Sequence, residues 1–240
     1  MATIALHSSR KAQNADRRFF TGMAITLLIL SVAGFARSYY LSHWFGTKTL
    51  TPLLQLHGAV MTLWILLFLT QTSLVATNRT DAHRRLGMIG LMLAGGVVAT
   101  SLASAFVTLG EGRLNKAVPA HVFLIFPIGL GLMFALLVGS AAYFYRNSAT
   151  HKRLMLLATI AATATPIARL GLPFLPRGAI GGNLALIPLI LTLGAHDLSS
   201  LKRLHPATCW GGGFIIAMLP ARLLFAQTDA WQAFVRWLGA

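Results

Sequence analysis

Four of the eight histidines lie within or just before four consecutive apolar stretches of the sequence. They are His57, His83, His121 and His151. Because helices that cross a membrane one after another alternate in direction, His57 and His121 would share one end of a bundle, and His83 and His151 the other. Two imidazoles on facing helices are the usual axial ligands of a low-spin haem b, since neutral nitrogen donors suit the iron. The spacing therefore predicts two pairs of haem ligands. The two haems that they hold would carry electrons across a membrane.

The stretch that contains His57 also carries a stripe of functional side chains. His57, Met61, Trp64, Phe68 and Gln71 follow one another at alternating spacings of four and three residues. On a helix this spacing gathers an imidazole, a thioether, two aromatic rings and an amide on one face, which should contact protein rather than lipid. We therefore expect Trp64 to lie beside a cofactor; packing within the bundle is the alternative.

Three arginines lie far along apolar stretches that begin with basic residues. Arg37, Arg169 and Arg222 are about 16 to 19 residues from those starts, which is roughly 24 to 28 Å along a helix. They would reach the same layer as His57 and His121. Guanidinium groups there would bind haem propionates, a quinone carbonyl or an anionic substrate. The alternative is that they extend to the outer lipid phosphates.

The composition indicates which kind of scaffold must hold these side chains. The chain has 240 residues, of which 56% are hydrophobic and 10% are charged, with a mean hydropathy of +0.69. Because a soluble domain has about 25% charged residues, the sequence predicts an integral membrane protein. Backbone groups that face lipid must be paired within their own segment, and alternating strand patterns are absent, so we expect an all-α, polytopic helix bundle.

Seven apolar stretches follow one another along the chain, and about 20 helical residues are needed to cross the hydrocarbon core. We therefore predict one transmembrane domain over residues 1–240 with seven helices between 20 and 226. Residues 1–19 would form a basic cytoplasmic N-terminus, and 229–240 an amphipathic tail on the outer interface. The expected helices cover 20–41, 52–76, 86–109, 119–145, 154–172, 181–195 and 209–226.

The distribution of lysine and arginine predicts the orientation. With a cytoplasmic N-terminus, the inner segments hold 12 of these residues and the outer segments 5, which agrees with the excess of basic residues on the cytoplasmic side. We therefore expect an N-inside, C-outside protein of the bacterial inner membrane. The net charge of +15 then serves orientation and contact with anionic lipids at the inner face, and not a nucleic-acid partner. The outer five are Lys48, Arg113, Lys116, Arg177 and Arg236.

The residues around the four histidines carry a family resemblance. Over about residues 54–172 the chain resembles the transmembrane di-haem cytochromes b of the ascorbate-reducible and ferric-reductase type. These carry one histidine on each of four consecutive helices, and the first pairs with the third and the second with the fourth. The chain also resembles uncharacterised bacterial seven-helix membrane proteins. The matching segments are His57-Gly58-Ala59-Val60-Met61, His83-Arg84-Arg85-Leu86-Gly87, His121 and His151-Lys152-Arg153-Leu154.

We therefore expect a b-type haem protein that transfers electrons across the membrane or to and from a quinone, which would make it a membrane oxidoreductase. His57 and His121 would be the better-placed ligand pair, because His83 and His151 adjoin double-basic loops.

Other functional classes remain open at this point. One is a cofactor-free accessory or assembly subunit that packs on a membrane partner or on a second copy of itself, and another is a small anion carrier. The five acidic residues lie at helix ends or in loops, which excludes a carboxylate-driven pump. The last apolar stretch has no lysine, which excludes a retinal Schiff base.

Overall fold

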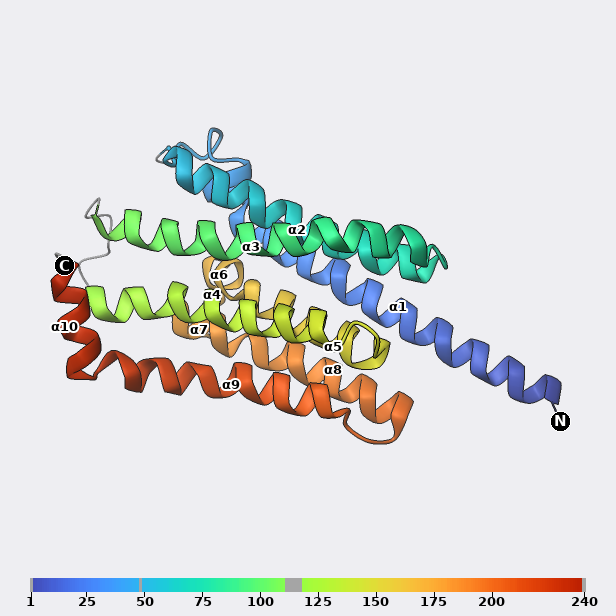
Figure 1. The fold of residues 1–240 in the computed structure, drawn as a ribbon. Coiled ribbons are helices and arrows are strands. Elements are labelled where there is room, and N and C mark those ends of the chain that lie inside the picture. The colour runs from blue at the N-terminus through green and yellow to red at the C-terminus, as the bar shows by residue number, and fades with distance from the viewer. Residues whose placement is uncertain (1, 48, 111–117, 239–240) are drawn as a thin grey trace.

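The computed structural model describes residues 2–47, 49–110 and 118–238, with side chains from Gln13 onward. Helices dominate this part of the chain, and no strand occurs within it, which confirms the prediction of an all-helical fold. The helices run roughly alongside one another, and the two termini lie at opposite ends of the bundle (Figure 1). Lys48, Arg113 and Lys116, which were counted for the orientation, lie outside the described residues.

Six helices are long and apolar enough to cross a membrane; with their extensions they cover Gln13–Tyr40, Pro52–Ala76, Thr80–Gly110, Ala120–Tyr143, Ala179–Leu201 and Pro206–Ala226. This is one fewer than the seven predicted stretches. The elements are α1 Ala2–Phe35, a π-helical turn η1 Ala36–Tyr40, α2 Pro52–Ala76, α3 Thr80–Gly110, α4 Ala120–Tyr143, α5 Ser148–Ala162, α6 Ala164–Arg169, α7 Ala179–Leu184, α8 Leu186–Leu201, α9 Pro206–Ala226 and α10 Asp229–Trp237.

Local sequence explains where several helices begin. Thr51 caps α2, since its hydroxyl accepts the Leu54 N–H, and Pro52 occupies the first helical position, where a missing N–H costs nothing. Asn147 caps α5 in the same way by accepting the Thr150 N–H. Side-chain caps of this kind satisfy backbone donors that have no partner inside the helix.

Prolines divide two of the predicted stretches. The stretch 154–172 is split at Thr163 into α5 and α6, and the chain from 179 to 201 is split at Ala185 into α7 and α8. Each break lies three residues before a proline, Pro166 and Pro188. Because proline has no N–H and its ring clashes with the carbonyl four residues back, it starts a new helical segment instead of continuing the old one. The fifth predicted span is therefore two shorter helices.

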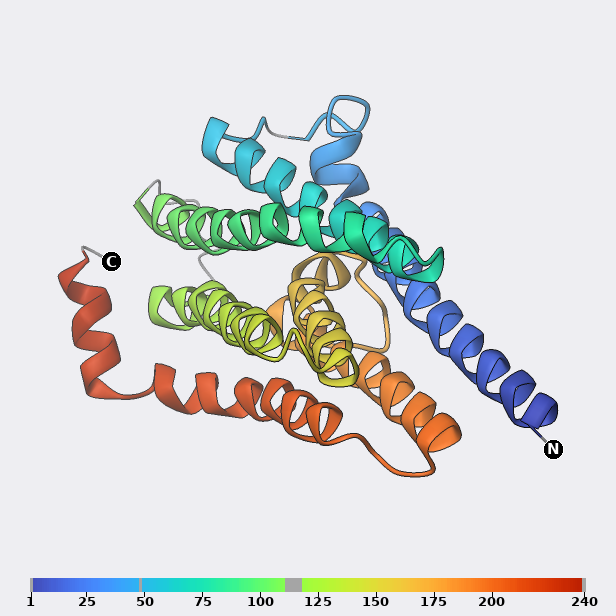
Figure 2. The ribbon, with the colours of Figure 1, turned by 45° about the vertical axis from the view of Figure 1, so that its right-hand side comes forward.

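The bundle core is apolar and is shared by most of the helices. α2 packs between α1 and α3, α4 contacts α3, α5 and α9, and the short α6 packs on α1 and α7. The fully buried side chains concentrate on α4 and α5, and α5 has an almost continuous buried run from Leu156 to Ala161. α5 therefore occupies the centre of the bundle, with other helices around it (Figure 2).

A buried ion pair joins three helices at the end of the bundle where α5 begins. Arg153 of α5 is 2% exposed, and its Nε and Nη2 donate to Asp197 Oδ1 of α8 at 2.9 and 2.5 Å. The other carboxylate oxygen accepts the Thr208 hydroxyl at 2.6 Å and the His205 N–H at 3.1 Å. Every lone-pair direction that the carboxylate presents is thus used, which is the condition under which a buried charge pair is tolerated.

The same end also fixes α1 to the bundle. Asp16 of α1 forms a salt bridge with Lys152, with 2.5 Å between Oδ2 and Nζ. Its Oδ1 lies 3.2 Å from His196 Nε2. The His196 ring stacks on Phe19, with 3.8 Å between ring centroids. Charged groups from α1, α5 and α8 therefore meet in one layer, which agrees with an end of the bundle that lies in the headgroup region.

His205 caps α9 and should make stability pH-dependent. Its Nδ1 accepts the Ala207 N–H at 3.1 Å, which requires an unprotonated Nδ1. Burial, and next the positive charge of Arg153, lower the pKa of His205 below the usual value of 6.5. The unfolded chain therefore binds more protons than the folded one between these two pKa values, so stability is lost as the pH falls below about 6.5.

We expect thermal unfolding in detergent to occur at lower temperature at pH 5 than at pH 7.5. H205N keeps a side-chain acceptor for the helix cap but does not titrate, so the difference between the two pH values should be smaller in this variant. An equal pH dependence in both proteins would contradict the assignment.

The other end of the bundle is closed by α10. This helix turns sharply away from the axis of α9 (Figures 1 and 2). Trp231 and Val235 are buried against the bundle, and Trp231 Nε1 donates to the His121 carbonyl at 2.8 Å. Trp237 is 79% exposed on the other side. One face of α10 thus docks on α4, and the other is free to contact an interface.

Candidate functional site

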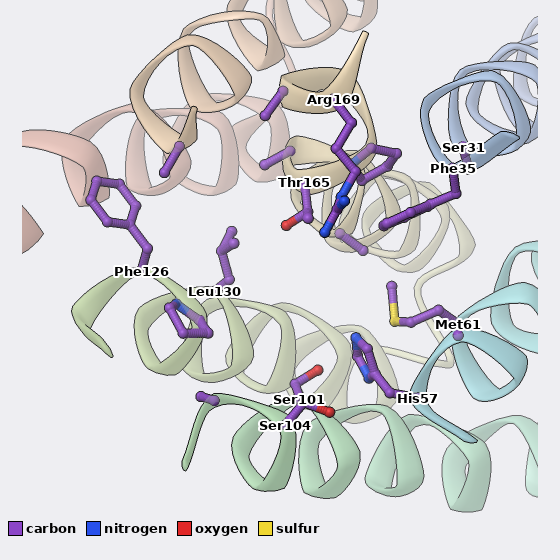
Figure 3. A pocket seen from close by; sticks show the side chains of 18 of the residues that line it. Ser31, Phe35, His57, Met61, Ser101, Ser104, Phe126, Leu130, Thr165 and Arg169 are labelled. Carbon is purple, nitrogen blue, oxygen red and sulfur yellow. The ribbon is translucent and has the colours of Figure 1, made fainter. Parts of the chain in front are cut away.

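A cavity of about 650 Å³ opens in the half of the bundle that includes the start of α2. Its walls come from α1, α2, α3, α4, α6 and α7, and most of the lining side chains are apolar. Figure 3 shows His57 on one wall and Arg169 on the facing wall. Its volume is within the range of about 300–1,000 Å³ that is typical of small-molecule and cofactor sites.

The hydrogen bonds around His57 define the state of its ring. Thr100 donates its hydroxyl hydrogen to the Gly96 carbonyl at 2.8 Å. The same hydroxyl lies 3.1 Å from His57 Nδ1, and when its hydrogen is directed to Gly96 its oxygen accepts a hydrogen from Nδ1. The neutral imidazole then carries its hydrogen on Nδ1 and leaves Nε2 with a free lone pair. A histidine fixed by a second partner in this manner is typical of metal ligands.

Positive charge lies on the wall opposite His57. Arg169, near the end of α6, lines the cavity and lies over the Phe35 ring, with its Cζ 5.1 Å from the ring centroid. Its Nη1 donates to the Ser38 hydroxyl at 3.4 Å, which leaves the remaining guanidinium donors available. Arg177 also lines the cavity, from the loop between α6 and α7. Two guanidinium groups therefore face the same space.

Two serines add polar atoms without partners. The Ser31 and Ser104 hydroxyls line the cavity, each serine is 7% exposed, and neither oxygen has a hydrogen-bond partner among the described residues. A buried hydroxyl without a partner costs about 1–3 kcal/mol, so such groups normally meet a ligand or ordered water. Both serines thus place a buried hydroxyl without a partner in the wall of the cavity.

Arg222 lies directly behind the cavity wall. It is 2% exposed, and its Nη2 donates to Asn183 Oδ1 at 2.5 Å, while Nη1 donates to the Phe126 carbonyl at 3.3 Å. Its Cζ also lies 5.0 Å from the Phe126 ring centroid. Asn183 and Phe126 both line the cavity. Arg222 is therefore turned into the bundle and does not extend to the outer headgroups.

Arg222 passes α4 only because residue 129 is a glycine, since a Cβ there would overlap the Arg222 Cδ. We expect Gly129→Ala to destabilise the protein by about 1–3 kcal/mol through this overlap, even though alanine favours a helix by about 1 kcal/mol over glycine. Gly139 lies on the same helix with open space around its missing Cβ, so Gly139→Ala should be neutral or stabilising. Equal effects of the two changes on thermal unfolding would argue against this packing.

The structure brings only some of the predicted site residues to the cavity. His57 and Arg169 line it, whereas His121, Arg37 and Trp64 are not among the lining residues. Arg37 is exposed and lies over the Phe45 ring. Trp64 is 2% exposed and packs edge-on against Phe134, which does line the cavity. Trp64 therefore supports the wall from behind.

The second predicted pair lies close together. The ring centroids of His83 and His151 are 6.2 Å apart and their planes are perpendicular. His151 Nδ1 is 2.8 Å from the Ala141 carbonyl, and His83 Nδ1 is buried with no partner among the described residues. Two imidazoles that share one iron have centroids roughly 6 Å apart, because each metal–nitrogen bond is about 2 Å. The cavity does not reach either ring.

Sequence reasoning did not select several of the residues that shape the site. Arg177 was counted only for orientation, and Thr100, Ser31, Ser104 and Asn183 were not considered. A polar residue inside an apolar stretch was the available signal for all but Arg177, since such residues normally face the interior of a bundle. Within the described part of the chain, no group of three or more metal-ligating side chains lies close enough to hold a metal ion.

The fold and site together define a class: a multi-pass helical membrane bundle with a half-buried, mainly apolar cavity that contains one imidazole and two guanidinium groups. No known family model, curated protein or solved structure matches the chain. The likeness to di-haem cytochromes b therefore stays a prediction from the four histidine segments.

Proposed function

We propose that the protein is a b-type haem electron-transfer protein and that the cavity near the start of α2 holds the haem. The observation that carries this proposal is the His57 ring, whose Nδ1 lies 3.1 Å from the Thr100 hydroxyl and whose Nε2 has no hydrogen-bond partner among the described residues. A bare nitrogen beside apolar walls suits a metal centre and does not attract a simple anion.

The other lining residues fit the same group. Apolar walls suit the macrocycle, and Arg169 and Arg177 offer guanidinium donors for its two carboxylates. His57 would hold the haem iron, with Thr100 fixing the orientation of the imidazole ring. A bound haem b supplies reversible one-electron transfer, and this chain sets its exposure and charge environment. Since His57 is the sole histidine among the described lining residues, this site differs from the pairing with His121 that the sequence suggested.

His83 and His151 are a second candidate ligand pair, favoured by the 6.2 Å between their rings. Two sites would place one electron carrier in each half of the bundle, which is the arrangement expected of transmembrane electron transfer. The first site has a cavity of the size that a cofactor needs. The second has two imidazole rings at the separation expected for ligands of one iron.

We also propose that the chain crosses the bacterial inner membrane seven times, with the N-terminus inside. The broken α5–α6 segment would provide the seventh crossing. The termini at opposite ends of the bundle support an odd number of crossings (Figure 1). The excess of basic residues in the segments assigned to the inside supports the orientation.

A reduced-minus-oxidised absorbance spectrum of protein purified in detergent after haem-replete expression tests the proposal. We expect a Soret band, with about one haem per chain if the cavity alone is filled, and about two haems per chain with a sharp α-band if the His83–His151 pair also binds. Protein without either band would rule the function out.

Quinol binding is the second candidate for the same cavity. His57 Nε2 would accept a hydroxyl hydrogen of the reduced quinol, and Arg169 would donate to a carbonyl oxygen of the oxidised quinone. Organic extraction of the purified protein, followed by chromatography for bound quinone, separates this candidate from the haem protein.

A further inference from the structure

The cavity has an unbalanced positive charge. Arg169 and Arg177 line it, and none of its described lining residues is an aspartate or a glutamate. Arg222 adds a third guanidinium group behind the cavity wall. It donates hydrogen bonds to Asn183 and Phe126, which line the cavity. Three cations thus surround one side of an apolar space.

Arg222 is the least expected of these cations. Its described partners are all neutral: the Asn183 amide oxygen and the Phe126 and Met218 carbonyls. The ion pairs found among the described residues involve Asp16 and Asp197 at the opposite end of the bundle, and none includes Arg222. A charge at this depth is costly unless an opposite charge compensates it, and in membrane helices such a residue generally marks a functional site.

We propose that the ligand of this cavity is an amphipathic anion, and that Arg222 is a buried counter-charge for its carboxylate or phosphate group together with Arg169 and Arg177. The apolar walls from α2, α3 and α4 would receive the body of the ligand. Asn183 separates Arg222 from the cavity, so Arg222 acts through the field and through the orientation of the Asn183 amide, and is a positioning residue.

The inference rests on the same site as the proposed haem but not on its iron. A porphyrin carboxylate, a long-chain carboxylate and a lipid-like phosphate share the required chemistry. These three kinds of ligand share an anionic group and differ in their apolar part. Pairs of ligands that differ only in charge can therefore test the inference separately from the proposed function.

The first test compares an iron-free porphyrin, protoporphyrin IX, with its dimethyl ester, by porphyrin fluorescence on protein in detergent and with protein-free micelles subtracted. A second arm compares a fluorescent long-chain carboxylate with its methyl ester. We expect at least tenfold tighter binding of the acid than of the ester in one of these arms, and a weaker preference at high salt.

The variants test Arg222 itself. R222M should reduce the acid-over-ester preference severalfold, R222K should retain most of it, and R37M should leave it unchanged because Arg37 is exposed outside the cavity. A merely structural Arg222 would instead weaken acid and ester equally in R222M. If R222M does not fold, the preference of the unmodified protein and its retention in R222K still decide the question.

The outcomes separate the two proposals. A preference for the acid in the long-chain arm, in protein that forms no haem bands, would support the anion site and refute the haem function. Haem bands in a protein that binds acids and esters equally would support the haem function and overturn the role of Arg222. Equal binding of acid and ester in both arms overturns the inference outright.

Discussion

Asp197→Asn should lower the free energy of unfolding by about 3–5 kcal/mol, because it breaks a buried charge pair and leaves Arg153 without compensation. Asp197 is 0% exposed and accepts four hydrogen bonds from three residues. If the asparagine oxygen faces Arg153, its NH₂ group must face the His205 N–H, which places donor against donor. Chemical unfolding in mixed detergent micelles measures the loss.

Two controls show whether the loss comes from burial of an unpaired charge. D81N changes an exposed acid in the first turn of α3 and should cost less than about 1 kcal/mol. The double variant R153M/D197L removes both charges, and apolar replacements of buried pairs are often neutral. Its stability should therefore exceed that of D197N. If the double variant were less stable than D197N, the charge pair would itself be the main source of stability.

His57→Ala should remove the haem bands assigned to the cavity, because no other histidine among the described lining residues can replace the lost ligand. Thr100→Val keeps the ligand but removes the oxygen that holds its Nδ1 hydrogen, and should weaken haem binding by about 10–100-fold. Titration of haem into protein expressed without it, followed at the Soret maximum, measures both effects.

His121→Ala is the matched control. It removes the partner that the sequence suggested for His57, yet His121 does not line the cavity and only its backbone carbonyl holds Trp231. We expect the haem content to stay near that of the unmodified protein. Loss of the bands in H121A with retention in H57A would mean that the cavity is not the haem site.

The length of the apolar stretches was sufficient to predict much of the fold. The stretch 52–76 coincides with α2 because Thr51 and Pro52 mark its start and an unbroken apolar run fills the rest. The stretch 154–172 failed as a single helix, because hydropathy does not register the carbonyl that Pro166 leaves unpaired. Pro166 and Pro188 are visible in the sequence, but each helix breaks three residues before its proline, and hydropathy does not show the position of that break.

The candidate site was harder to predict because it depends on how each helix is rotated about its axis. Residue spacing placed His57 and His121 at the same height, and height alone does not decide whether two rings face each other. His57 lines the cavity and contacts the Thr100 hydroxyl, whereas the His121 carbonyl accepts a hydrogen bond from Trp231 of α10. Arg222 was selected from its position along the helix, but its inward turn depends on the missing Cβ of Gly129, a neighbour 93 residues away in sequence.

The pairing of Arg153 with Asp197 has a consequence for biosynthesis. The two residues are 44 positions apart, so the ribosome delivers the arginine to the bilayer well before its carboxylate exists. Arg153 lies near the start of α5, and its buried charge has no compensating carboxylate until Asp197 of α8 is in place. The buried pair can therefore form only after α8 has been synthesised, so α5 reaches its final packing late in biosynthesis.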